Sequence, residues 1–240
     1  MNPWTNLIRI LVDAFSFVLD FIFNFTGNYA LAIILMTILL NIAFTPMRIK
    51  STKSTKMMQL LQPKIDEINK KYKDDKERIS KETMELWKKY DFNPVAGCGP
   101  ALAQMPLFIA MFEILRNLTF PDGTASFLWI ENIALQESVY GIVLFGSIDL
   151  KILPLIAGVA SYYQGKFLAL GSPQSGAQGS NQMMMTVMMP AMMIWICWSN
   201  PASLSLYWAT SQICYAIQQA ILQRYIKVEL LPEDSVKSSK

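Results

Sequence analysis

Histidine is absent from the 240-residue chain, and charged residues make up only 16% of it. Without an imidazole there is no histidine general base and no metalloprotease helix, and no glycine-rich phosphate loop precedes a Lys-Ser or Lys-Thr pair. No two acidic residues share an apolar span, which excludes an intramembrane aspartyl dyad. An enzyme is therefore the least favoured class, and no cofactor or metal is expected.

Cysteine is also scarce. The three cysteines, Cys98, Cys197 and Cys214, all lie in apolar segments and have no paired spacing. We interpret them as small buried apolar residues rather than as metal ligands or a redox pair.

Apolar residues, by contrast, are abundant and come in long blocks. They make up 52% of the chain, which is typical of an integral membrane protein rather than of a soluble domain. About 20 apolar residues are needed to cross ~30 Å of hydrocarbon. Segments that approach this length are 29–47, 95–115, 152–168, 183–198 and 201–222. Because only "SNPAS" separates the last two, they are predicted to be antiparallel neighbours.

The distribution of Lys and Arg predicts the orientation. Basic residues crowd the region between the first two spans and the C-terminal tail, whereas Asn117 to Leu150 contains none. By the positive-inside rule, the basic loop and the tail are cytoplasmic.

These patterns predict an all-α polytopic membrane protein with a five-helix transmembrane bundle. The predicted divisions are an N-terminal amphipathic helix (1–27), a first span (28–50), a cytosolic helical hairpin (51–92), a second span (93–117), an extracytoplasmic loop (118–151), a third span (152–169), a cytosolic linker (170–182), a fourth span (183–199), a fifth span (200–223) and a cytosolic basic tail (224–240).

The N-terminal segment allows several interpretations. Its polar residues recur every three or four positions and so share one helical face; they are Asn6, Arg9, Asp13, Ser16, Asp20 and Asn24. This pattern favours a helix that lies in the membrane interface. A sixth span and an uncleaved signal anchor remain alternatives.

The basic loop carries its own helical pattern. Met58, Leu61 and Ile65 form one apolar stripe, a second follows, and the "KDD" between them can cap the second helix. The hairpin is either a solvated element that satisfies the positive-inside rule or a recruiting arm near anionic headgroups.

Uncharged polar residues are unusually frequent within the predicted spans. They are Thr37, Asn41, Gln104, Gln164, Thr186, Ser205, Thr210, Ser211 and Gln212. Any one of them can be explained by an interhelical hydrogen bond, but a set drawn from most spans fits a shared hydrated cavity better. The fourth span is rich in methionine, which suits a surface that accommodates varied apolar partners; the residues concerned are Met184, Met185, Met188, Met189 and Met192.

Several ordered motifs carry a family resemblance. "LQPKI" (61–65), Asn93-Pro94, Gly97-Cys98 and "QMP" (104–106) resemble the cytosolic hairpin and the following span of the YidC/Oxa/Alb family of membrane protein insertases. "MMMTVMMPAMM" and "SLSLYWATSQICYAIQQAILQRY" resemble the family's last two spans. Because no large extracytoplasmic domain precedes the first predicted span, the chain resembles the short five-span bacterial type of the family.

The resemblance implies a membrane protein insertase and chaperone of the bacterial cell membrane. It implies a hydrophilic groove open to cytosol and lipid, with no cofactor. Nascent membrane proteins would be the clients, with the Sec translocon and the ribosome as partners and no recognition of nucleic-acid sequence. A non-catalytic assembly scaffold and a small-solute channel remain alternatives.

The resemblance also assigns residues to these parts. The groove would be lined by Thr37, Asn41, Gln104, Thr186, Tyr207, Trp208, Ser211 and Gln212. The recruiting hairpin would use Gln62, Pro63, Lys64, Asp74, Asp75 and Trp87.

One position departs from the family pattern. The family normally carries an Arg in the groove five residues before the proline of the first span, where this chain has Asn41. Arg48 and Lys50 follow Pro46 and are predicted to lie at the cytosolic interface. We therefore expect a groove without this positive charge and a weaker dependence on client acidity.

Overall fold

The structure is a computed structural model that describes residues 3–73, 75–118, 121, 123–128, 130, 132–135, 143–144, 148–149, 151–170 and 184–228. Its helices are α1 (Pro3–Thr26), α2 (Tyr29–Ala43), α3 (Thr45–Lys71), α4 (Lys76–Lys89), α5 (Val95–Asn117), α6 (Ile152–Leu170), the π-helical η1 (Met184–Met188), α8 (Met189–Ser199) and α9 (Ala202–Tyr225). In the described part of the chain, the two-residue strands β1 (Val143–Leu144) and β2 (Ile148–Asp149) pair antiparallel. The fold is thus essentially all-helical, as predicted.

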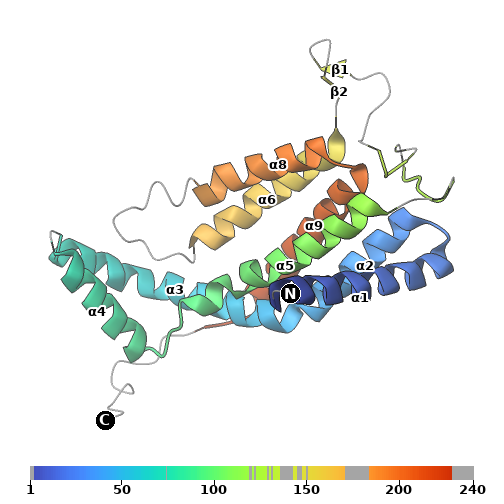
Figure 1. Ribbon diagram of the computed structural model, residues 1–240. Coiled ribbons are helices and arrows are strands. Elements are labelled where there is room, and N and C mark those ends of the chain that lie inside the picture. Colours follow the sequence, from blue (N-terminus) through green and yellow to red (C-terminus); the bar gives the residue numbers. More distant parts are fainter. Residues whose placement is uncertain are drawn as a thin grey trace.

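The long helices form a bundle around α9 (Figure 1). Helix α6 packs against both α8 and α9, while α2 packs on the other flank of α9 and α1 covers α2 and α5. Helices α3 and α4 project from one end, which we call the hairpin end. The described residues between 121 and 135 lie at the opposite end, which we call the loop end. The main apolar core is shared among α1, α2, α5, α6, α8 and α9.

The first predicted span is bent. Helices α2 and α3 meet at 55° around Phe44, and only as a pair do they have the length and apolar character needed to cross a membrane. No single described helix meets that criterion alone. The assignment of individual spans therefore stays a prediction, although helices occupy all five expected segments.

The predicted boundary between the first span and the hairpin, at residues 50 and 51, does not coincide with a break. Pro46 lies in the first turn of α3, where its missing N–H leaves no helical bond unmade. Beyond it α3 runs without interruption to Lys71, even through Pro63. The helix that begins the hairpin therefore starts inside the bundle.

Helix α1 is amphipathic, as its periodicity predicts. Gly27, at φ +64°, turns the chain directly into α2, a conformation that glycine adopts at no steric cost. Leu19 is fully buried against the bundle, whereas Arg9, Asp13 and Asp20 are exposed. The depth of α1 relative to a membrane stays a prediction.

The hairpin has a small core of its own. Met58, Leu61, Ile65 and Tyr90 are buried together, with Trp87 packed against them. As predicted, Asp75 caps α4, and its carboxylate accepts a hydrogen bond from the N–H of Arg78 at 3.0 Å. The apolar stripe of the sequence therefore joins α3 to α4.

The loop end is closed by hydrogen bonds between residues 124–135 and the helix termini. The N–H of Tyr29 donates to the carbonyl of Thr124, while the N–H groups of Ala202 and Ser203 donate to the carbonyls of residues 135 and 133. These bonds satisfy N–H groups that the first helical turns leave without a partner. Ile130 and Ile133 are also buried, so the described residues of the loop end pack over the helix termini.

Candidate functional site

A cavity of about 110 Å³ lies between α3, α5, α6, α8 and α9. Its lining combines polar and apolar side chains, namely Arg48, Ser51, Gln104, Met105, Phe108, Ser161, Gln164, Gly165, Met189, Pro190, Met193, Trp208, Ser211, Gln212 and Tyr215. The described lining includes one cation and no acidic side chain. A mostly uncharged polar wall with one positive charge is therefore the main electrostatic feature of the site.

Arg48 lies inside the bundle, with only 7% of its surface exposed. Its Nη2 donates to Oδ1 of Asn41 at 2.7 Å, and its Cζ lies 4.6 Å from the centre of the Tyr215 ring. This position corrects the expectation that Asn41 leaves the site without a positive charge. An arginine side chain on a helix points toward the N-terminus, so the guanidinium returns two turns to reach Asn41. Lys50, by contrast, is exposed.

Two atoms of the guanidinium are free to bind something else. Nε and Nη1 of Arg48 are buried and have no hydrogen-bond partner among the described residues. A buried charge without such partners is costly, because desolvation is not compensated. The site is therefore suited to an anionic or strongly polar group that enters from outside.

Hydrogen bonds between helices hold the other polar side chains in place. Gln104 on α5 donates to the hydroxyl of Tyr207 on α9 at 3.2 Å, and Trp208 Nε1 donates to the hydroxyl of Ser161 on α6 at 3.2 Å. These contacts fix the polar wall between three helices. Side chains of Ser211 and Gln212 are buried in the same wall.

The predicted groove residues divide into those that line the cavity and those that do not. Gln104, Trp208, Ser211 and Gln212 line it, and Asn41 and Tyr207 contact lining residues. Thr37 is fully buried and donates to the carbonyl of Ile33 within α2. Neither Thr37 nor Thr186 is part of the lining.

Only part of the methionine-rich segment lines the cavity. Met189 lines the cavity, whereas Met188 and Met192 are exposed on the outside of the bundle. The side chains of Met184 and Met185 lie outside the described part of the structure. The π-helical η1 directly precedes Pro190, whose nitrogen carries no hydrogen to donate to the preceding turn.

Some residues that line the cavity were not predicted from the sequence. Tyr215 follows Ser211 by one helical turn, so helical spacing could have placed it in the same wall. Ser51 similarly follows Arg48 by three residues. Phe108 and Met193 gave no signal, because apolar residues in an apolar helix do not reveal which face is inward.

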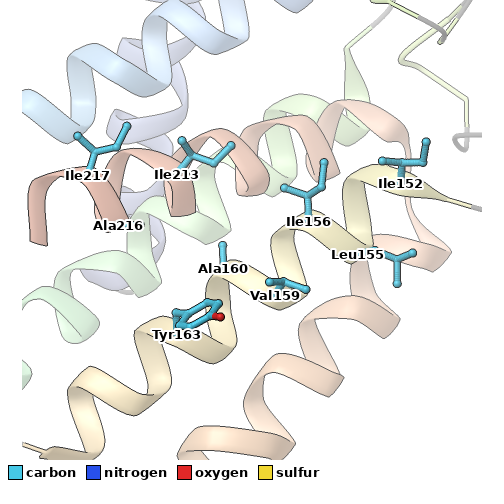
Figure 2. A pocket seen from close by; sticks show the side chains of 9 residues that line it. All are labelled: Ile152, Leu155, Ile156, Val159, Ala160, Tyr163, Ile213, Ala216 and Ile217. Carbon is cyan, nitrogen blue, oxygen red and sulfur yellow. The ribbon is translucent and has the colours of Figure 1, made fainter. Parts of the chain in front are cut away.

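A second cleft, of about 520 Å³, lies between α6 and α9 and is lined by apolar residues (Figure 2). Ile152, Leu155, Ile156, Val159, Ala160, Tyr163, Ile213, Ala216 and Ile217 form its walls. Figure 2 shows the side chains of Ile213 and Ile217 projecting from α9 above α6. This cleft presents no charged side chain and is unsuited to a polar segment.

The predicted recruiting residues lie at the hairpin. Gln62 donates to Asp66, Lys64 donates to the hydroxyl of Tyr90, and Trp87 packs in the hairpin core. Asp74 lies outside the described residues. The structure thus gives Lys64 and Trp87 structural contacts, and a recruiting role stays a prediction.

An all-helical bundle with a polar cavity and a charged hairpin has the features of a helical membrane protein. Comparison with known proteins then gives the family. Residues 21–229 match the model of the 60Kd inner membrane protein family. The chain is 34% identical over 218 residues to the membrane protein insertase YidC of Fusobacterium nucleatum, covering 91% of this chain and 97% of that protein.

Other relatives differ in length. Identity to the membrane protein insertase MisCA of Bacillus subtilis is 35% over 231 residues, covering 94% of this chain and 82% of the relative. The chain spans only 37% of the YidC of Treponema denticola, at 31% identity. A crystal structure of an active YidC insertase with its first transmembrane domain resolved matches with a TM-score of 0.60 and 25% identity, covering 95% of this chain and 48% of that one.

The chain therefore belongs to the 60Kd inner membrane protein family of bacterial membrane protein insertases. This confirms the family resemblance of its motifs and places it in a bacterial membrane.

Proposed function

We propose that the chain inserts membrane proteins by receiving the polar segment of a client in the Arg48 cavity while the client's apolar segment passes into lipid. The observation that carries this proposal is the buried guanidinium with two unpaired nitrogens in a polar cavity. Such a site can exchange hydrogen bonds with an extended polar peptide.

The free-energy argument is simple. Bare polar groups cost several kcal/mol each in hydrocarbon. A polar cavity that reaches into the bundle shortens the path through hydrocarbon that the client's polar segment has to cross. Burial of the client's apolar segment in lipid, at about 25 cal/mol per Å², then drives insertion without nucleotide hydrolysis.

The exit of the apolar segment would lie between α5 and α8. Met105 on α5 and Met189 on α8 both line the cavity, and the described residues of these two helices pack on each other far less than those of α6 and α8 do. Both methionines are substantially exposed. Flexible methionine side chains can adapt to clients of different sequence.

The proposal includes an orientation. With the hairpin and the C-terminus in the cytosol, the cavity would open toward the cytosol and the loop end would seal the outer side. The hairpin would receive clients, and its basic residues together with the tail would contact the ribosome. Cooperation with the Sec translocon and chaperone activity belong to the same proposal.

The test is reconstitution of the purified chain alone in liposomes. A client with a short polar N-terminal segment and one apolar span is synthesised in the presence of these vesicles and is then treated with external protease. The proposal expects the polar segment to become protected in vesicles that contain the chain and not in empty ones.

Two alternatives give different results in the same vesicles. A scaffold that only holds spans together would leave the polar segment accessible. A small-solute channel would release an encapsulated dye in the absence of any client, whereas an insertase sealed at the loop end would retain it.

A further inference from the structure

The hydrogen bond between Asn41 and Arg48 crosses the bend between α2 and α3. Asn41 belongs to α2 and Arg48 to α3, whose axes differ by 55°. The bond is short, at 2.7 Å, and both residues are buried. The position of the cavity's cation therefore depends on a contact with the other side of the bend.

The amide of Asn41 is oriented for this contact. Its Nδ2 donates to the carbonyl of Thr37 at 2.7 Å, which leaves Oδ1 to face Arg48. Gln218 on α9 donates to the carbonyl of Asn41 at 3.0 Å and to the hydroxyl of Thr45 at 3.2 Å. Asn41 is thus held by contacts within α2 and with α9, in addition to its contact with the guanidinium.

Tyr215 holds the guanidinium from a second direction. The ring lies 4.6 Å from Cζ, within the range of a cation–π interaction. With Nη2 bound to Asn41, the remaining Nε and Nη1 are the atoms without a partner among the described residues. Asn41 therefore occupies one nitrogen of the guanidinium and leaves the other two for a client.

The backbone of α3 is anchored independently of Asn41. The hydroxyl of Thr52 donates to Oε1 of Gln219 at 3.2 Å. Lys56 donates to the carbonyls of Gln223 and Ile226 at 2.7 and 2.6 Å. Loss of the Asn41 amide would consequently release the Arg48 side chain rather than displace the helix.

We propose that Asn41 is a positioning residue that holds the Arg48 guanidinium in the cavity and thereby sets a preference for clients with acidic polar segments. This inference rests on the proposed function and deepens it. A freed arginine can extend along α3 and place its charge in water, as long basic side chains do near membrane surfaces. The carboxylates of the client would then lose their charge-assisted hydrogen bonds to the guanidinium.

The experiment measures a preference ratio, defined as insertion of an acidic client divided by insertion of the same client with Asn and Gln in place of Asp and Glu. We expect Asn41→Leu to lower this ratio about tenfold, the effect of one hydrogen bond to a charged group, and to the level of Arg48→Leu. Asn41→Asp keeps the contact but neutralises the charge, so it should lower the ratio as well.

An exchange variant separates positioning from folding. Asn41→Arg combined with Arg48→Asn keeps both side-chain types and moves the cation to the α2 side of the bend, so the ratio should recover to within about twofold of wild type. Thr52→Val is the matched control, because it removes an α3–α9 hydrogen bond without touching this pair, and its ratio should equal that of wild type.

A wild-type ratio for Asn41→Leu alongside a reduced ratio for Arg48→Leu would overturn the positioning role. A wild-type ratio for Arg48→Leu would overturn the acidic preference itself. Neither result bears on whether the chain inserts clients at all, which is refuted separately if the wild-type chain inserts neither client.

Discussion

Gly158 on α6 offers a sharp test of how α8 is placed beside the cavity. A Cβ at this position would lie 2.3 Å from Cγ1 and 2.4 Å from Cδ1 of Ile194 on α8. Carbon atoms in contact are normally about 3.5–4.0 Å apart, so Gly158→Ala requires a displacement of roughly 1 Å or more. Because isoleucine in a helix is largely confined to one χ1 rotamer, the side chain cannot simply swing aside.

The expected cost is that of an overpacked core, about 1–3 kcal/mol. For a chain of this length, each kcal/mol corresponds to a decrease of about 2–4 °C in the unfolding midpoint. Thermal unfolding of the purified protein in detergent measures this decrease in the midpoint. Helix α8 carries Met189, Pro190 and Met193, so the same substitution should widen the cavity.

A double-mutant cycle assigns the effect to the named contact. Ile194→Ala removes the atoms that collide, so Gly158→Ala should cost little in that background, with a coupling energy of about 1–3 kcal/mol. Equal midpoints for wild type and Gly158→Ala, or additive effects in the double variant, would refute the close packing of α6 and α8.

Three further predictions concern hydrogen bonds. Lys56→Met removes the ammonium that donates to the carbonyls of Gln223 and Ile226 at the C-terminal end of α9. Hydrogen exchange there should accelerate by about tenfold or more, and unchanged exchange would contradict the contact. Asp75→Ala removes the cap of α4 and should cost about 0.5–2 kcal/mol of local stability, detectable as faster exchange confined to α4. Gln104→Leu strands the buried hydroxyl of Tyr207 at about 1–3 kcal/mol, and adding Tyr207→Phe should recover most of that loss, whereas no recovery would argue against the pairing.

The sequence predicted helices and their apolar faces well, because local periodicity carries that information. The stripe through Met58, Leu61 and Ile65 and the cap at Asp75 are both present. The polar residues Gln104, Ser211 and Gln212 were also assigned to a common site, and they line one cavity. In each case the pattern is set within one helix or by the mismatch between a polar residue and an apolar span.

Arg48 shows where sequence reasoning ended. Because Arg48 follows Pro46, a residue that often interrupts a helix, the sequence predicts it at the cytosolic interface. The proline instead begins α3, which continues through the bend, and the long side chain returns toward the bundle. Pairings between distant helices, such as Ser161 with Trp208, depend on tertiary packing that no local pattern encodes.

The most direct test of the central claim is site-specific photocrosslinking to a stalled client in membranes. A photoreactive residue is placed either at Gln212, in the wall of the polar cavity, or at Ile217, in the apolar cleft between α6 and α9. The account predicts that the polar segment of the client crosslinks at position 212 and not at position 217. Crosslinks at 217 with none at 212 would contradict it.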